Sequence, residues 1–502
     1  MHRKILSLSI LLLLACVFVE ISRRTGSIGS DSWQSAGPAA LSQYPFDLKG
    51  AYLGDFDHYD HKWGHHWPGW PALISVITST VGFHAVVVFS ICILFNILAG
   101  YAAYKGLKSF WGANAAFCVM LAVALIPDLN VAASFMRPEC LVSLLATILQ
   151  VILVGRKNCR SSALFVIPLC FGLVFTHVLG PVIVVGFLLA ELLTNPSRFK
   201  QELCSFKWSN VKSLAFGLSL GMGMLGFWFL ADDARSHHFF QNIEAQKSSY
   251  HSLLNSAKLC FFSDLNGLFV LALFATMLTL YLYLIVTRSK MALKHYAVVP
   301  LVCLLFSIIT HNPNRSHLAC VLPCVLFLLA AFLHDRAKWC RILYVGVVVI
   351  FSAFHLKRVA VVLNQPDDDI RKEMRSFLSR NHTSDLRLIP PSLWETAAEM
   401  RMKNVRLYTF PNVALLPYQV ECEKHLWTDV KNGDVLIFDE TSTSYSSDYF
   451  HDDVLARLRI VDPKQVGEVL QQVEIRGLSQ TKNYSVIRIT NERYIREALE
   501  TN

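Results

Sequence analysis

Two short motifs set acidic side chains beside apolar stretches of the chain. Ser30-Asp31-Ser32-Trp33 follows the first apolar stretch, and Met136-Arg137-Pro138-Glu139 directly precedes another. Ionisable groups at such a boundary are candidates for function, although a single acid there is most often only solvated. Pro138 suits the first turn of a helix, and the helix dipole favours an acid there, so we expect Glu139 to be fixed at a helix start. The simpler alternatives are a solvated Asp31 and an Arg137–Glu139 pair that only anchors a helix at the membrane edge.

A third group of chemically active residues fills one loop. Residues 55–71 read DFDHYDHKWGHHWPGWP and mix acids, histidines, one lysine and tryptophans. Its tryptophans suit the headgroup level of a membrane interface. An interfacial amphipathic segment is the simpler alternative. A dedicated zinc site is less favoured, because no pair of ligands has the helical spacing of zinc enzymes.

Two later turns add further histidines and an arginine. They are Phe175–Gly180 and His311–His317, and each lies between two apolar stretches. Loop solvation would explain either turn alone. Together with the motifs above, these turns would border one face of a helical bundle. Ionisable groups gathered at membrane depth are candidates for function.

The elements that must position these groups are apolar segments near membrane-spanning length. Of the 502 residues, 53% are hydrophobic, and a spanning helix needs roughly 20 residues. We predict about eleven transmembrane helices, near residues 5–21, 84–104, 112–127, 139–155, 162–176, 179–194, 214–231, 266–287, 296–311, 317–333 and 341–356. Residues 5–19 resemble a signal sequence, but an uncleaved first helix is favoured because more spans follow.

The distribution of lysine and arginine sets the expected topology. These residues concentrate in every second connection, which by the positive-inside rule places the N-terminus in the cytoplasm. The loop 22–83, the turn 128–139 and the C-terminal tail are then extracytoplasmic. The net charge of +9 is dispersed in small groups between apolar blocks, which argues against a nucleic-acid partner. The 13 cysteines show no zinc-site or disulfide spacing.

The tail has the pattern of a small α/β domain. Residues 368–380 and 391–402 are helix-like, whereas residues 405–410, 434–438, 469–475 and 484–489 are strand-like. The expected fold class is therefore an α-helical polytopic membrane protein with a C-terminal small α/β extracytoplasmic domain. We place the transmembrane domain at residues 1–357 and the α/β domain at residues 358–502.

The order of these motifs resembles the membrane-embedded GT-C glycosyltransferases that use polyprenyl-phosphate sugars, such as aminoarabinose transferases and protein O-mannosyltransferases. In that family an acidic motif follows the first span, as Asp31 does here. A Lys-Pro-Pro-like stretch is similar to Lys62–Pro68, and an Arg-Pro-acid motif to Arg137-Pro138-Glu139. A Thr-Lys-Gly-like turn is similar to Thr176–Gly180, with histidine in place of lysine, and a late turn to Arg315–Pro323. The resemblance covers roughly residues 1–355.

The resemblance implies an inverting glycosyltransferase (a hexosyl or pentosyl transferase) with a GT-C-like domain. Asp31 would be the general base, and Glu139 a second catalytic carboxylate. Five residues would bind the donor phosphate, namely Lys62, His66, Arg137, His177 and Arg315. Trp33, His65 and Trp67 would contact acceptor or sugar. Glu139 would either orient the acceptor or help Asp31 to hold a divalent metal ion, and the sequence leaves open whether such an ion is used.

The implied partners are a polyprenyl-phosphate sugar donor, membrane lipid, and a lipid, glycan or protein acceptor. The expected location is a bacterial plasma membrane, with the active site and tail on the extracytoplasmic side. A transporter or lipid flippase without glycosyl transfer is the alternative, although it would place charged or broken helices at mid-bilayer. A structural or sensory membrane protein is a third class, which leaves Asp31 and Arg137-Pro138-Glu139 unexplained.

Overall fold

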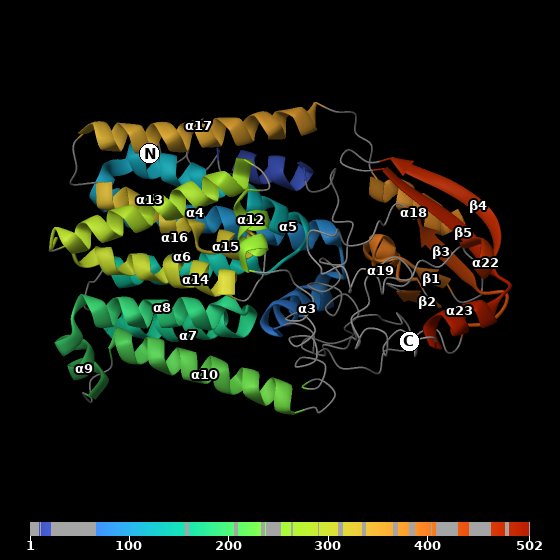
Figure 1. Cartoon of the computed structure of the whole chain (residues 1–502), viewed down its shortest axis with the longest axis horizontal. Helices are drawn as coiled ribbons and strands as arrows, with labels where there is room; N and C mark the ends of the chain where they lie inside the picture. Colours follow the sequence, from blue (N-terminus) through green and yellow to red (C-terminus); the bar gives the residue numbers. More distant parts are fainter. Residues whose placement is uncertain are drawn as a thin grey trace.

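The structure is a computed structural model of the chain. It describes residues 10, 12–21, 67–155, 160–204, 209–231, 236, 253–262, 265–289, 291–309, 315–333, 338–364, 370–380, 387–402, 404–407, 430–440, 463–476 and 481–500. A bundle of apolar helices forms one end of the molecule, and a small sheet with its own helices forms the other (Figure 1).

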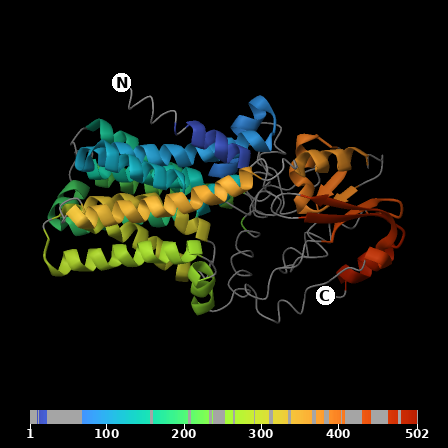
Figure 2. The same ribbon diagram turned by 90° about the horizontal axis from the view of Figure 1, so that it is seen from above.

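The bundle consists of helices that run broadly along one common direction, with a few short helices across them (Figures 1 and 2). Its helices are α3 (Gly69–Val81), α4 (Ala85–Ala124), α5 (Pro127–Ser134), α6 (Glu139–Gly155), α7 (Arg160–Thr176), α8 (Leu179–Thr194), α9 (Pro196–Cys204), α10 (Asn210–Leu230), α12 (Leu253–Phe262), α13 (Leu265–Val286), the 3-10 helix η1 (Ala292–Ala297), α14 (Val298–Ile309), α15 (Arg315–Ala319), α16 (Leu322–Leu333) and α17 (Lys338–Leu363). Residues 12–21 are also helical.

Several of these helices are able to cross a membrane. Among the described residues, four are long and apolar enough on their own, and the number rises to six if each of two bent helix pairs is one span. The four are Ala85–Ser109, Asn210–Leu230, Leu265–Val286 and Cys340–Val361. A helix lies at each of the eleven predicted places, but most are shorter than a full span, so the number eleven remains a prediction.

Helix α4 contains two of the predicted spans. Its backbone leaves the helical conformation at Gly112, where φ is 76°, a value that glycine adopts without strain. The amide of Asn96 donates to the carbonyl of Ala124 at 3.3 Å, so the two halves of α4 run back along each other. The element is therefore a helical hairpin.

Two segments that we expected to be loops contain helices. The end of the long first loop forms α3, and the turn 128–139 contains α5. Both helices are short and begin at or next to a proline, and both bury apolar side chains against the bundle. Tertiary packing therefore stabilises helices that are too short to form alone.

The C-terminal region forms a mixed five-stranded sheet in the order β2-β1-β3-β5-β4. Strand β1 pairs in parallel with β2 and β3, whereas β5 pairs antiparallel with β3 and β4. The strands are β1 (Arg387–Ile389), β2 (Val405–Leu407), β3 (Val435–Asp439), β4 (Gly467–Arg476) and β5 (Thr481–Ile489). The strand-like patterns at β2, β3, β4 and β5 are confirmed, whereas β1 was not predicted.

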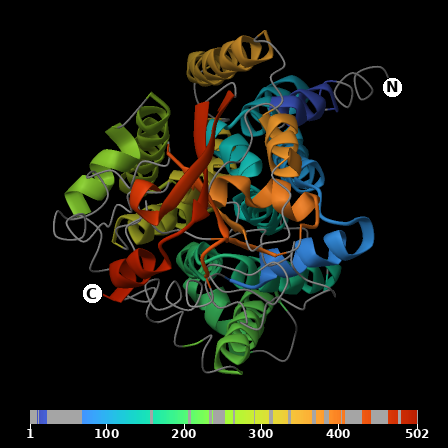
Figure 3. The ribbon, with the colours of Figure 1, turned by 90° about the vertical axis from the view of Figure 1, so that its right-hand side faces the viewer.

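Helices cover both faces of this sheet (Figure 3). They are α18 (Ile370–Arg380), the 3-10 helix η2 (Pro391–Leu393), α19 (Trp394–Glu399), α22 (Pro463–Val466) and α23 (Glu492–Glu500). In β3, Val435 and Ile437 join the core shared with the bundle, whereas Leu436 and Phe438 join a separate core with α23. Successive side chains of a strand point to opposite sides, and a core lies on each side of β3, so the strand is buried on both faces. Helix α17 runs across the predicted boundary at residue 357, and the division into two domains remains a prediction.

The sheet region contacts the bundle at the start of α4. The Glu399 carboxylate accepts a hydrogen bond from the backbone N–H of Ala85 at 2.9 Å, and its other oxygen pairs with Arg375 at 2.8 Å. The ring of Phe83 lies 5.4 Å from that of Trp394. The side chain at position 84, the N-cap of α4, makes no capping hydrogen bond. Glu399 therefore caps α4 from 314 residues away in the chain.

Replacing Glu399 by alanine should lower the apparent free energy of unfolding by about 1–2 kcal/mol, since it removes this cap. Arg375→Ala is the matched control. That side chain is 56% exposed, so loss of its ion pair should cost less than about 1 kcal/mol. Thermal unfolding in detergent measures both variants. Equal losses in the two would show that the ion pair matters and the cap does not.

Candidate functional site

The site begins at the turn between α5 and α6. Met136 has a positive φ of 53°, the N–H of Arg137 donates to the Ala132 carbonyl at 3.0 Å, and the N–H of Met136 donates to Ala133 at 3.0 Å. This is the Schellman pattern that ends helices, with methionine where glycine is usual. Pro138 directly precedes α6, whose first residue is Glu139, so the helix begins where these two residues predicted.

Glu139 and Arg137 form a buried ion pair at the start of α6. The guanidinium Nη2 of Arg137 lies 2.6 Å from Oε1 of Glu139, and the two side chains are 14% and 0% exposed. The same Nη2 lies 3.4 Å from Nε2 of His317, in α15, and that ring nitrogen is 3.8 Å from Glu139. The positive charge of Arg137 therefore compensates a carboxylate that water does not reach.

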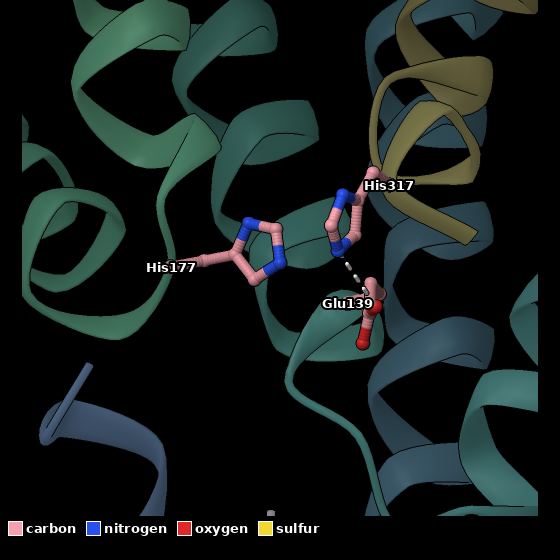
Figure 4. A group of neighbouring side chains, drawn as sticks. All are labelled: Glu139, His177 and His317. Atoms are coloured by element: carbon pink, nitrogen blue, oxygen red, sulfur yellow. Dashed lines mark ion pairs between the residues drawn. The ribbon is translucent and has the colours of Figure 1, made fainter. Parts of the chain in front are cut away.

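His177 reaches the same place from the turn between α7 and α8. That turn is tight because Gly180 packs against the last turn of α7, where a Cβ would lie 1.8 Å from the Leu173 carbonyl oxygen. The rings of His177 and His317 are edge to face, with centroids 4.8 Å apart. Figure 4 shows one ring nitrogen of His177 directed toward His317 and Glu139. Three segments far apart in sequence thus supply one cluster.

The protonation of His177 follows from its contacts. Burial lowers the pKa of His177 to about 4, although the Glu139 carboxylate opposes this, so the ring is neutral near pH 7. Its Nδ1 accepts a hydrogen bond from the backbone N–H of Leu179 at 3.2 Å. The proton of the neutral ring is therefore on Nε2, which makes that atom a hydrogen-bond donor. Arg137 and His177 together offer donors to an anion.

The cluster contains residue types that bind metals. Ligand atoms of Glu139, His177 and His317 all lie within 4.8 Å of one another, and glutamate with two histidines is a known zinc ligand set. In this arrangement, however, the guanidinium of Arg137 contacts both Glu139 and His317, and Nε2 of His177 carries a proton. The side chains as placed therefore fit a guanidinium better than a divalent cation.

The structure brings together three of the site residues expected from the sequence, namely Arg137, Glu139 and His177. It adds His317, which lies in a turn noted in the sequence but was not assigned a role. The only signal for it was the position of that turn between two apolar stretches. Trp67 is partly exposed and directly precedes Pro68, the N-cap of α3.

The remaining expected site residues lie outside the part of the chain that the structure describes. They are Asp31, Trp33, Lys62, His65 and His66. For Arg315 the backbone is described, as the first residue of α15, but the side chain is not. Their roles stay predictions.

The fold is similar to that of solved membrane proteins, although the sequence comparisons found no match. No family model and no curated protein matches the sequence. Among solved structures, the chain is similar to ArnT from Cupriavidus metallidurans bound to undecaprenyl phosphate, with 11% identity, a TM-score of 0.58, and coverage of 97% of this chain and 98% of that chain. The fold is the GT-C fold. ArnT in the apo state gives the same coverage, with 13% identity and a TM-score of 0.57.

The likeness to the GT-C fold spans the C-terminal sheet as well as the bundle, because nearly the whole of both chains aligns. An oligosaccharyltransferase from Archaeoglobus fulgidus, in complex with zinc and sulfate, aligns with 12% identity, a TM-score of 0.46, and coverage of 86% of this chain and 68% of that chain. The resemblance to GT-C glycosyltransferases expected from the motifs is confirmed at the level of the fold.

Proposed function

We propose that this protein is an integral-membrane glycosyltransferase of the GT-C type. It would transfer a sugar from a polyprenyl-phosphate donor to a hydroxyl of a lipid, glycan or protein acceptor, with inversion. The observation that carries the proposal is the buried cluster of Arg137, Glu139, His177 and His317 in a chain with the ArnT fold. ArnT itself has been seen with undecaprenyl phosphate bound, which supports a lipid-phosphate donor.

The chemistry requires one group that accepts a proton and several that stabilise an anion. The acceptor hydroxyl attacks the anomeric carbon, its proton passes to Asp31, and the bond between that carbon and the phosphate oxygen breaks. The transition state carries positive charge at the sugar, and the leaving polyprenyl phosphate gains negative charge. Arg137 and the Nε2–H of His177 would stabilise that phosphate, together with Lys62, His66 and Arg315.

Glu139 is suited to a supporting role. Its side chain is fully buried and already engaged with Arg137, which favours holding the guanidinium in place over contact with the acceptor. Trp33, His65 and Trp67 would contact sugar or acceptor.

We infer that the reaction uses no metal at this cluster, because Arg137 already supplies the positive charge beside Glu139. Dialysis against EDTA should therefore leave the rate of donor cleavage unchanged, and added Zn²⁺ should not raise the thermal midpoint. Loss of activity on chelation, restored by one divalent ion, would contradict this inference.

The location follows from the same proposal. With the N-terminus in the cytoplasm, the cluster and the sheet lie on the extracytoplasmic side of a bacterial plasma membrane, where lipid-linked sugars replace nucleotide sugars. Single cysteines placed in the exposed part of α23 and in α9 should react with an impermeant thiol reagent from opposite sides of the membrane. Labelling of both from one side would contradict the topology.

The test of function uses the purified protein in lipid nanodiscs. A panel of polyprenyl-phosphate sugars is offered with mixed cell-envelope acceptors, and released polyprenyl phosphate is measured by mass spectrometry. Release from one donor, with the sugar appearing on an acceptor, is the expected result. Binding of a donor without release would point to a missing acceptor. No binding of any donor would reject the proposal in favour of a transporter.

A further inference from the structure

We propose that Trp70, with its neighbour Gly69, is a positioning residue that holds both turns of the Arg137–Glu139–His177 cluster in place from α3. The inference rests on the proposed function for its effect on catalysis, but its structural part can be tested alone. Gly69 and Trp70 lie at the end of the loop 55–71 noted in the sequence, but neither was assigned a role in the site. What points to them is a pair of contacts that α3 makes with two distant turns.

The first contact is a hydrogen bond from Trp70 to the turn before α6. The indole N–H of Trp70 donates to the backbone carbonyl of Met136 at 2.8 Å, and the Trp70 side chain is 1% exposed. This carbonyl and the N–H of Arg137 belong to one peptide unit, whose N–H donates to Ala132. The carbonyl of Met136 and the N–H of Arg137 are therefore both hydrogen-bonded. Because the peptide unit is planar, these two bonds fix its orientation and so the direction in which the Arg137 side chain leaves the backbone.

This turn requires an external restraint because the residue at its centre is a methionine and not a glycine. Met136 adopts the left-handed conformation with φ of 53°, which costs free energy for any residue with a Cβ atom. Its side chain is completely buried, which opposes replacement by glycine. A non-glycine residue in this conformation persists only where its surroundings fix it. The bond from Trp70 is one such restraint, and it comes from 66 residues away.

The second contact joins the start of α3 to the His177 turn. A Cβ on Gly69 would lie 2.6 Å from the Phe175 carbonyl oxygen and 3.0 Å from Oγ1 of Thr176. Only glycine allows α3 to approach this closely. Because Gly69 and Trp70 are consecutive, one helix turn sets the distance between the Arg137 turn and the His177 turn. The same segment continues the loop that carries Lys62 and His66.

The test compares Trp70→Phe with Trp111→Phe. The first variant keeps a large ring but removes the hydrogen bond to Met136. The control makes the same chemical change at an indole whose N–H has no hydrogen-bond acceptor among the described residues and which packs edge to face on Tyr344. Amide hydrogen exchange reports each turn without reference to activity.

We expect Trp70→Phe to speed exchange at residues 135–140 by about fivefold, while α16 stays unchanged. The donor-cleavage kcat should fall about tenfold with little change in KM, because misplacement of Arg137 weakens contacts made mainly in the transition state. Trp111→Phe should show neither effect. Gly69→Ala should speed exchange at residues 176–180 instead, by pushing α3 away from that turn.

Exchange in the Arg137 turn that is the same in Trp70→Phe and Trp111→Phe would overturn the inference, whatever the activity. Faster exchange throughout the bundle would overturn it too, because it would indicate general destabilisation. If exchange rises only in the turn while wild-type protein cleaves no donor, the positioning contact stands and the proposed function fails. The two failures are therefore distinguishable.

Discussion

Asp31→Asn is expected to lower kcat for donor cleavage by about 10²–10⁴-fold, the usual contribution of a general base. Asparagine preserves the size of the side chain but cannot accept the acceptor's proton. Donor binding should change by less than about twofold, because the proposed phosphate contacts come from Arg137 and His177. The measurement is release of polyprenyl phosphate at saturating donor, with the affinity for a non-reactive polyprenyl phosphate determined in parallel.

The matched controls for this variant are Asp55→Asn and Asp57→Asn. Both acids lie in the same long loop and have the same charge, but neither follows the first span directly. Each should retain activity within about threefold of the wild type, since loss of a solvated charge has small effects. If Asp55→Asn is as inactive as Asp31→Asn, the general base has been misassigned. If Asp31→Asn retains full activity, acid–base catalysis by this residue is rejected.

Arg137→Met is expected to destabilise the protein by about 3–5 kcal/mol, because it leaves the fully buried carboxylate of Glu139 without its closest positive partner. Glu139→Gln should also destabilise, by leaving the guanidinium without its counter-ion. The double variant Arg137→Met/Glu139→Gln should recover much of the loss, since no uncompensated charge remains. Thermal and denaturant unfolding in detergent would measure all three against the wild type.

Activity separates the structural role of this pair from its proposed chemical role. The double variant should regain stability but remain about 10²–10³-fold less active, because the donor to the phosphate is still missing. The exposed pair Arg198–Glu202 in α9 is the control, with side chains 47% and 19% exposed. Arg198→Met should cost less than about 1 kcal/mol and leave activity intact. An active double variant would show that Arg137 has no part in binding the donor phosphate.

Local patterns predicted the helices and most strands. Apolar stretches of helical length mark α6, α8, α10 and α13, and alternation of side chains marks β4 and β5. The start of α6 follows from Pro138 and Glu139 alone. Strand β1 was missed because its three residues are followed at once by Pro390 and Pro391, so it lacks a longer strand-like run such as the one predicted at residues 405–410. Helix α3 was missed because it is short and follows a polar, histidine-rich segment. Helix α5 was missed because it is short and begins at Pro127, which marks the end of the apolar stretch before it.

Some residues of the site could be predicted from local sequence and others could not. Arg137, Glu139 and His177 were identified because they lie at helix ends, where an ionisable residue is conspicuous between apolar blocks. His317 was not, because a histidine in a polar turn has no local feature that separates ligand from solvated side chain. Its contact with Arg137 spans 180 residues and depends on how α15 packs beside α6.

The apolar helices, the α/β character of the tail and the acidic and basic motifs could be predicted from the sequence, because they depend on composition and period over short windows. Which residues become partners depends on how the whole chain folds. The bond from Trp70 to Met136, the cap from Glu399 on α4 and the approach of His177 to His317 join segments that lie far apart in the chain. Such contacts arise from the packing of whole helices against one another, and helix packing is not encoded in any one window of residues.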